Sequence, residues 1–279
     1  MSDREPSRTA LATAYLRAAH QLLDATPPIL DDPVAVRLLG AGAAERIRAA
    51  AGHYRTPGAL ALRAHVVLRS RFAEDRLAAA VGRGVSQYLI LGAGFDTFAL
   101  RQPAWAQSLR IFEIDQPATQ AAKRARLSES GLAMPANAAF ADIDFERESL
   151  RAGLHRQRIS SQTKTFFSWL GVTMYLSEAA IDAALQTMAS FPSGSEVVLT
   201  FLQPSGPAAA ASPLADRVAG IGEPFVSRFE PDALREKLLA AGFTQVAFLS
   251  SEEAGARYFA ARPADLPVPG KTAIASAIR

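Results

Sequence analysis

Two glycines and an acidic residue in the first half of the chain have the spacing of a nucleoside-binding site. Gly92 and Gly94 directly follow a short apolar run, and the next apolar run ends in Asp115. In an open α/β sheet, this order places a tight turn after one strand, where backbone amides face a ligand. It also places a carboxylate at the end of the next strand, where it accepts hydrogen bonds from ribose hydroxyls. We therefore predict that Gly92, Gly94 and Asp115 bind a nucleoside, with Glu113 as the alternative acid.

The residues after the second glycine limit the kind of nucleoside. A dinucleotide fingerprint reads Gly-x-Gly-x-x-Gly, and its last glycine lets the helix pack closely beneath a pyrophosphate. This chain has Thr97 in place of that glycine. The difference favours a ligand without a pyrophosphate, such as S-adenosylmethionine, over NAD. Taken alone, the glycine pair is a weak signal, because a tight turn in any α/β protein has the same spacing.

The composition is that of an ordinary globular protein and excludes several kinds of site. Among the 279 residues, 30 basic and 27 acidic side chains are scattered, so the net charge of +3 does not favour a nucleic-acid partner. The lack of cysteine excludes thiolate catalysis, disulfides and cysteine-based zinc sites, and we predict no bound metal. No apolar stretch reaches the roughly 18 residues of a membrane span. The polar residues 1–6 are unlike a signal peptide, so we expect a cytoplasmic protein.

The first part of the chain is expected to be helical, and one of its helices carries a misplaced charge. Apolar residues at helical spacing predict helices over 9–23, after residue 33 and over 62–81. Arg69 falls on the apolar face of the last helix. That face is formed by Leu62, Val66, Phe72 and Ala73. An unpaired guanidinium is costly to bury, so Arg69 must find an anion. The alternatives are an arginine whose charged end reaches water and an internal salt bridge.

From residue 87 onward, strand-like runs alternate with helical stretches. Strands are expected at 88–91, 110–114, 138–141, 165–169, 196–201, 245–249 and 272–277. Helices are expected at 117–130, 146–155, 177–190, 231–241 and around 252–261. The alternation predicts a parallel sheet covered on both faces, with the last two strands as a hairpin-like edge. The stretch 205–212, which is rich in alanine, glycine and proline, is predicted to be flexible.

Seven strings of residues in one order resemble the leucine carboxyl methyltransferase family, most closely its bacterial S-adenosylmethionine-dependent branch. They are Arg17-Ala18-Ala19, Asp31-Asp32-Pro33, Arg69-Ser70-Arg71-Phe72, Leu91-Gly92-Ala93-Gly94-Phe95-Asp96-Thr97, Phe112-Glu113-Ile114-Asp115-Gln116-Pro117, Asp144-Phe145-Glu146-Arg147 and Phe167-Ser168-Trp169-Leu170-Gly171-Val172-Thr173-Met174-Tyr175-Leu176. The resemblance covers nearly the whole chain. It implies a class I methyltransferase fold, which is a Rossmann-like α/β fold with a seven-stranded, mostly parallel sheet and an N-terminal helical cap. We place the cap at 1–82 and the S-adenosylmethionine-binding domain at 83–279, as one structural unit.

The resemblance also implies which residues bind S-adenosylmethionine. Arg69 matches the arginine that holds the methionine carboxylate of the cofactor, and Arg17 is a looser match to a family lysine that would assist. Gly92 and Gly94 would lie against the methionine and ribose portion. Asp115 matches the acid that accepts the ribose hydroxyls.

Two further strings concern the adenine and the acceptor. Asp144 and Phe145 match the pair that holds the adenine, by its amino group and its ring face. Leu170, which we count with the cofactor-side residues, stands where the protein-phosphatase methyltransferases have a glutamate, so this chain is not expected to share their substrate. Bacterial relatives with Trp-Leu-Gly here are thought to act on small metabolites, frequently polyketide or peptide products.

The identity of the acceptor decides whether a base is needed. A carboxylate is ionised at neutral pH and needs none, whereas a hydroxyl must lose its proton to a nearby group. Tyr175 is our candidate catalytic residue in contact with the acceptor, although a half-buried aromatic residue at a helix start would look the same. Among the histidines we consider only His53 as a base, and we expect His20, His65 and His155 to be surface or satisfied core residues.

The sequence therefore predicts an S-adenosylmethionine-dependent O-methyltransferase. Its acceptor would be a carboxylate or hydroxyl of a small metabolite, in secondary metabolism, with no nucleic-acid or membrane partner. One alternative is a protein that binds S-adenosylmethionine without transferring its methyl group. A second alternative, an NAD-dependent reductase, is disfavoured by Thr97 and by the lack of a catalytic tyrosine–lysine pair.

Overall fold

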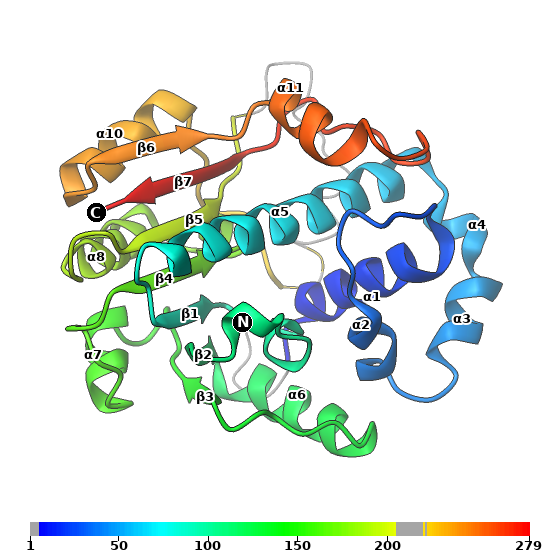
Figure 1. Ribbon diagram of the computed structural model, residues 1–279, viewed down its shortest axis with the longest axis horizontal. Coiled ribbons are helices and arrows are strands. Elements are labelled where there is room, and N and C mark those ends of the chain that lie inside the picture. Colours follow the sequence, from blue (N-terminus) through cyan, green and yellow to red (C-terminus); the bar gives the residue numbers. More distant parts are fainter. Residues whose placement is uncertain (1–5, 205–219, 221) are drawn as a thin grey trace.

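A seven-stranded sheet runs through the computed structural model, which describes residues 6–204, 220 and 222–279 (Figure 1). The strands are β1 (Gln87–Leu91), β2 (Arg110–Asp115), β3 (Ala138–Asp142), β4 (Thr165–Trp169), β5 (Glu196–Thr200), β6 (Gln245–Phe248) and β7 (Ile274–Ile278). Their order is β3-β2-β1-β4-β5-β7-β6, and every pair is parallel except the two that β7 makes. The predicted mostly parallel sheet and the pairing of the last two strands are confirmed. The predicted flexible stretch 205–212 and the residues 1–5 lie outside the described part of the chain.

The central strands are buried on both faces, as their mostly apolar sequences favour. All residues of β1, β4 and β5 are buried. Because successive side chains of a strand point to opposite faces, Tyr88 and Ile90 pack in one core cluster and Leu89 and Leu91 in another. The first cluster includes the buried face of α5 (Pro57–Gly82), and the second includes α7 (Leu150–Arg156), α8 (Glu178–Ala189) and α10 (Pro231–Ala241).

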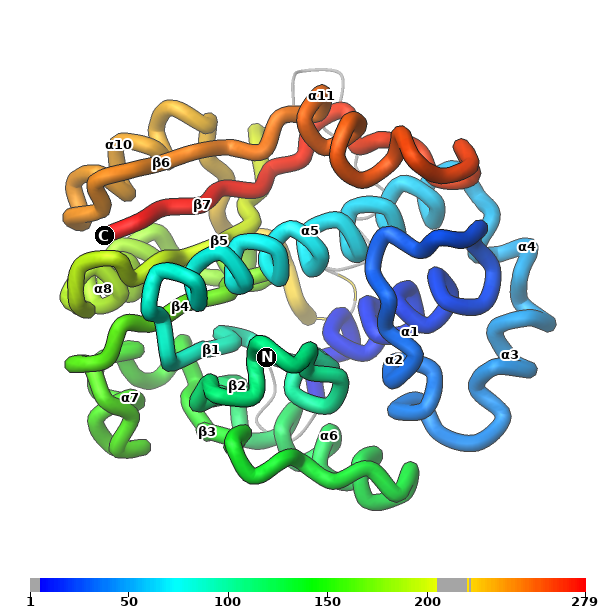
Figure 2. Tube along the Cα trace, viewed as in Figure 1, coloured from blue at the N-terminus to red at the C-terminus, as the bar shows by residue number. Residues whose placement is uncertain are grey.

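The helices before the sheet gather beside its carboxyl edge. They are α1 (Arg8–Leu23), α2 (Pro33–Leu38), α3 (Ala43–Ala49), α4 (Ala51–Tyr54) and the long α5. Figures 1 and 2 show α1 opposite the ends toward which the parallel strands point, with α2, α3 and α4 farther out. Small residues such as Ala14 and Ala18 let α1 pack closely with these helices in a third core cluster. Since α5 also packs in the core of the sheet, it joins the cap to the sheet, and the boundary at residue 82 stays a prediction.

Most element boundaries match the sequence-based expectations within a few residues, but four helices differ. The short helices α3 and α4 were not predicted. α7 begins at Leu150 rather than at residue 146, because the Ser149 hydroxyl accepts a hydrogen bond from the amide of Ala152 and caps the helix there. The helix expected around 252–261 is a short α11 (Ser251–Ala254) followed by a π-helical turn, Gly255–Phe259. α6 (Pro117–Glu129) lies where it was expected.

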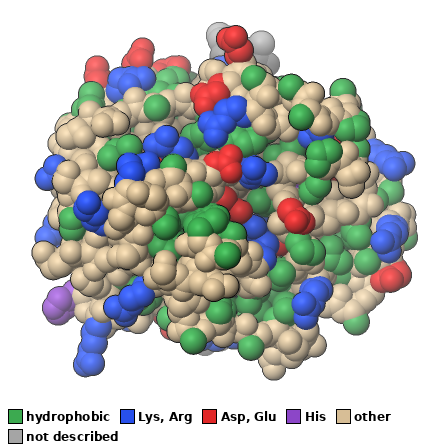
Figure 3. Space-filling view, in the orientation of Figure 1, with side chains coloured by type: hydrophobic (Ala, Val, Ile, Leu, Met, Phe, Trp, Pro, Cys, Tyr) green, Lys and Arg blue, Asp and Glu red, His purple; other side chains and the backbone are tan. Residues whose placement is uncertain are grey.

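The distribution of surface charge, the character of the helices and the placement of acidic and histidine residues concern nucleic-acid, membrane and metal binding. Lys and Arg side chains are interspersed with other residues on the face shown in Figure 3, rather than gathered into one basic patch. Within the described part of the chain, no helix has the length and apolar character needed to cross a bilayer. The same residues contain no group of His, Asp and Glu that could hold a metal ion.

Candidate functional site

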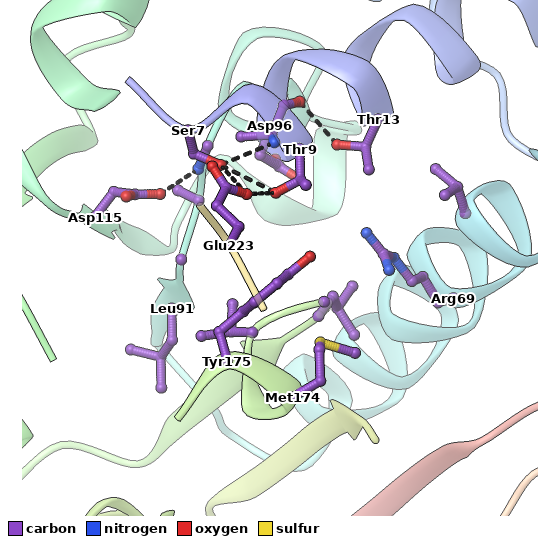
Figure 4. A pocket seen from close by; sticks show the side chains of 18 of the residues that line it. Ser7, Thr9, Thr13, Arg69, Leu91, Asp96, Asp115, Met174, Tyr175 and Glu223 are labelled. Carbon is purple, nitrogen blue, oxygen red and sulfur yellow. Dashed lines mark hydrogen bonds between the residues drawn. The ribbon is translucent and has the colours of Figure 1, made fainter. Parts of the chain in front are cut away.

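A pocket of about 760 Å³ opens at the carboxyl ends of the parallel strands, between α1 and α5 (Figure 4). This volume is typical of small-molecule and cofactor sites, and the carboxyl edge is where open α/β sheets bind ligands. Every residue predicted to bind the cofactor or to contact the acceptor lines this one pocket: Arg17, Arg69, Gly92, Gly94, Asp115, Asp144, Phe145, Leu170 and Tyr175. The structure therefore brings these residues together, from six separate segments of the chain.

The glycine turn after β1 has a conformation that only glycine adopts readily. Gly92 and Gly94 have φ values of +68° and +50°. A Cβ atom on Gly92 would lie 2.2 Å from Cγ2 of Val172, and one on Gly94 would lie 2.9 Å from Cβ of Ala10. The glycines are thus required by the close approach of the chain itself, in addition to any ligand. The sequence-based interpretation had attributed them to a tight turn and to the approach of a ligand, and it did not include these contacts.

Asp115 is the acid that faces the pocket. Its carboxylate accepts hydrogen bonds from the amide of Gly94 at 2.6 Å and the amide of Gln116 at 2.8 Å. Burial raises the pKa of Asp115 to about 6, and these two hydrogen bonds oppose the rise. The alternative acid, Glu113, does not line the pocket, because it is fully buried and forms an ion pair with Lys123.

Arg69 extends from α5 toward the centre of the pocket (Figure 4). Its guanidinium packs over Gly171, where a Cβ atom would lie 2.8 Å from its Nη atoms. It makes no hydrogen bond or ion pair with any residue that the structure describes. Burial first, and then the charge of Arg17, lowers the pKa of Arg69 to about 10. The internal salt bridge considered as an alternative is therefore absent from the described residues, and the guanidinium is available to an anion.

The guanidinium of Arg17, unlike that of Arg69, already has hydrogen-bond partners within the protein. Its Nε donates to the carboxylate of Asp32 at 3.2 Å, and its Nη2 donates to the carbonyl of Phe95. Asp32 also accepts a hydrogen bond from the hydroxyl of Thr97 at 2.7 Å. Arg17 and Asp32 therefore connect the cap to the glycine turn. Apart from the Asp-Asp-Pro string, nothing in the sequence indicates this pairing.

The residues after β3 and β4 complete two walls of the pocket. The Asp144 carboxylate accepts a hydrogen bond from the amide of Glu146 at 3.0 Å, which orders the turn that presents it. The half-buried ring of Phe145 packs against the second core cluster. Leu170 packs against the first cluster and makes the pocket wall after β4 apolar at that position.

Tyr175 belongs to a short 3₁₀ turn, Thr173–Tyr175, and its ring lies 5.6 Å from that of Phe225. Burial raises the pKa of Tyr175, the charge of Glu223 adds to the rise, and a hydrogen bond with Thr9 opposes it. The phenol is therefore protonated at neutral pH. It lies between the beginning of α1 and the segment after residue 222 (Figure 4).

Glu223 is a pocket residue that the sequence did not reveal. It is buried, and its carboxylate accepts hydrogen bonds from the amide of Arg8 at 3.0 Å, the hydroxyl of Ser7 at 3.4 Å and the hydroxyl of Thr9. These donors form the first turn of α1, where the positive end of the helix dipole favours a carboxylate. No motif surrounds Glu223, and only the long-range contact shows that it closes the pocket.

The histidines differ from the expectation in two respects. His53, the candidate base, is exposed on α4 and does not line the pocket. His65, which we expected to be a surface or satisfied core residue, lines the pocket one turn before Arg69 and makes no hydrogen bond with a described residue. The expectation for His65 was wrong. His65 and Arg69 lie on one face of α5, as their helical spacing requires, and this face borders the pocket. His20 is buried and paired with Asp24 at 2.8 Å, as expected for a core histidine.

Comparison with known proteins agrees with this arrangement. The sequence model described as Leucine carboxyl methyltransferase matches residues 10–189. The chain belongs to this family. It is therefore an S-adenosylmethionine-dependent methyltransferase, in agreement with the pocket and with the resemblance read from the sequence strings.

Individual members of the leucine carboxyl methyltransferase family and solved structures support the same fold. The "Putative S-adenosyl-L-methionine-dependent methyltransferase YktD" of Bacillus subtilis is 29% identical over 292 residues, which cover 95% of each chain. A protein of Mycolicibacterium paratuberculosis with the same description is 30% identical, over 68% of this chain and 73% of its own. The crystal structure of a "putative methyltransferase" from Thermobifida fusca has 18% identity and a TM-score of 0.59, covering 98% of this chain and 94% of its own. This last likeness shows the class I methyltransferase fold.

Proposed function

We propose that this protein methylates an oxygen atom of a small, largely apolar metabolite. The observation that carries the proposal is the unpartnered guanidinium of Arg69, which lies in one pocket with the glycine turn and Asp115. When bound, S-adenosylmethionine supplies a methyl group on an electrophilic sulfonium. Such a methyl donor also brings a carboxylate, and a carboxylate is the partner that a buried guanidinium requires.

The residues present fit the methyl donor along its length. Arg69 would bind the methionine carboxylate, and Asp115 would accept hydrogen bonds from the ribose hydroxyls with the lone pairs that its backbone donors leave free. Asp144 would accept a hydrogen bond from the adenine amino group, and Phe145 would contact the adenine ring. Arg17 would act through the glycine turn that it holds, since its own donors are engaged.

The rest of the pocket suits an apolar acceptor. Its lining on the side of β4, β5 and α5 includes the apolar side chains of Leu62, Val66, Met174, Phe201, Leu202 and Phe225. These side chains exclude water and hold an acceptor in place, and positioning of this kind can contribute roughly 7–11 kcal/mol toward the barrier. Tyr175 is protonated at neutral pH and would donate a hydrogen bond to the acceptor. A polyketide or peptide product is the acceptor class that the resemblance to bacterial members implies.

Methyl transfer is tested with S-adenosylmethionine that carries a labelled methyl group. The wild-type protein is incubated with the labelled donor and a small-molecule extract of the cells from which the protein derives. We expect label in an organic-soluble product with the wild type and none with Arg69→Met. Donor binding measured by calorimetry, together with no label in any small molecule, would contradict the proposal and favour a protein that binds the donor without transferring its methyl group.

A further inference from the structure

His65 places an unpartnered imidazole in the wall of the pocket. It lies on α5 one turn before Arg69 and shares the pocket-facing stripe of that helix with Leu62 and Val66. Neither ring nitrogen makes a hydrogen bond with a residue in the described ranges. Because His65 lines the pocket, a ligand bound there can supply the partner of this ring.

The imidazole is neutral in the empty pocket. Burial lowers the pKa of His65 to about 3, and the charge of Arg69 adds to the effect. Several other titratable side chains line the pocket: Arg8 and Arg17 on α1, Asp96 after β1, Asp115 at the end of β2, Asp144 and Glu146 after β3, Tyr175 after β4, Glu223, and Lys271 before β7. A neutral imidazole has one nitrogen with a free lone pair, which can accept a proton or a hydrogen bond.

We propose that His65 is the general base of the reaction and that the acceptor atom is therefore the oxygen of a hydroxyl group, such as a phenol. This inference rests on the proposed methyl transfer and names its acceptor class. The hydroxyl proton passes to the free imidazole nitrogen while the oxygen forms its bond to the methyl carbon. The carbon–sulfur bond breaks with its electron pair remaining on sulfur, and the imidazolium later releases its proton to water.

The charges of the pocket favour His65 in this role. A carboxylate bound to Arg69 would offset the positive charge that lowers the affinity of His65 for a proton. The positive charge of the sulfonium also disappears as the imidazolium forms, so the total charge in the pocket does not change. Binding of the methyl donor would therefore raise the affinity of His65 for a proton, against the burial that lowers it in the empty protein.

The other candidate groups are less suited to receive the proton. The raised pKa of Tyr175 keeps its phenol protonated, so it is a donor. The carboxylate oxygens of Glu223 already accept hydrogen bonds from the first turn of α1. An ionised carboxylate acceptor would bring no proton and would leave His65 without a role.

The chemical class of the product tests the acceptor. Mild alkali hydrolyses methyl esters to methanol and leaves methyl ethers intact. We expect the labelled product formed from the cell extract to keep its label after mild alkali. Release of the label as methanol would show a carboxylate acceptor and overturn the inference, while the proposed methyl transfer would stand. A failure to label any product would contradict the proposed function itself.

Substitution of His65 tests the base. His65→Gln keeps a hydrogen-bonding side chain but cannot take up a proton, and His53→Gln is the matched control because His53 is exposed outside the pocket. We expect His65→Gln to slow label transfer by about 100-fold or more, with the affinity for S-adenosylhomocysteine changed less than about threefold. His53→Gln should match the wild type. A wild-type rate in His65→Gln would overturn the assignment.

A measurement without turnover keeps the base testable if no acceptor is found. The His65 imidazole signal, identified in proton NMR spectra by its loss in His65→Gln, is followed against pH. We expect a neutral ring down to about pH 4 in the empty protein and a higher pKa with S-adenosylhomocysteine bound, because the ligand carboxylate offsets the charge of Arg69. A pKa that does not rise on binding, or a ring already protonated at neutral pH in the empty protein, would overturn the inference.

Discussion

The carboxylate of Glu223 accepts a hydrogen bond of 3.0 Å from the backbone amide of Arg8, a residue 215 positions away in the chain. This contact holds the first turn of α1 over the pocket. The same turn carries Ala10, which packs so closely on the glycine turn that Gly94 has no room for a side chain. Glu223 therefore holds the start of α1 in place, and α1 in turn shapes the part of the pocket where the methyl donor would bind.

Glu223→Ala is expected to weaken binding of the methyl donor, although Glu223 is not one of the residues proposed to contact it. The substitution removes the acceptor of the first turn of α1, so the helix start should fray and the free energy of unfolding should fall by about 1–2 kcal/mol. We expect the Kd of S-adenosylhomocysteine to rise about tenfold by calorimetry. Glu230→Ala is the control, because Glu230 is exposed and makes no capping bond. Equal affinity in both variants would contradict this account.

Arg69→Met is expected to separate binding from stability. The substitution removes a desolvated charge with no partner in the described residues, so the empty protein should unfold at the same or a higher temperature. Binding of S-adenosylhomocysteine should weaken by about 3 kcal/mol or more, and the ligand should no longer raise Tm. Arg71→Met, at an exposed arginine paired with Asp75, should keep the ligand-induced rise. An earlier unfolding of Arg69→Met with an undiminished ligand effect would show a structural salt bridge instead.

Donor affinity is expected to depend on pH through Asp115. The pKa of its carboxyl is raised to about 6, mainly by burial. Only the ionised form accepts hydrogen bonds from both ribose hydroxyls, so affinity is complete above pH 6 and falls as the pH drops below 6. Asp115→Asn should bind about 1.5–3 kcal/mol more weakly at pH 8 and lose this dependence.

The control for this pH dependence is Asp142→Asn, one strand away and outside the pocket lining. It should keep both the affinity and its decrease at low pH. A wild-type protein with constant affinity from pH 5 to about pH 8 would show that Asp115 does not contact the ribose.

Gly92→Ala is expected to destabilise the fold through the loop after β4. The new Cβ would lie 2.2 Å from Cγ2 of Val172, in a backbone conformation with positive φ. Overpacking and the left-handed conformation together should cost about 2–5 kcal/mol in denaturant unfolding. A double-mutant cycle with Val172→Ala separates the two causes, since only the overpacking is relieved. Strict additivity of the two substitutions would rule out the clash.

The sequence was sufficient for the features that depend on local pattern. The strand run over residues 88–91 is apolar throughout because both faces of the sheet are covered, and this is visible without a structure. The misplaced charge of Arg69 likewise showed in helical spacing alone. Contacts between distant segments could not be predicted in this way, since nothing near Glu223 indicates that it meets the start of α1. His65 was missed because a helical pattern shows that Arg69 and His65 share a face but does not show that this face borders a cavity.

The place of β7 in the sheet has a consequence for the order of assembly. β7 pairs with both β5 and β6, so β6 has no hydrogen-bonded neighbour in the described sheet until β7 is in place. An intermediate that lacks β7 would expose two unpaired strand edges, which invite association with other molecules. Lys271, directly before β7, belongs to the pocket wall. The insertion of β7 between β5 and β6 thus removes both open strand edges and also brings Lys271 to the pocket wall.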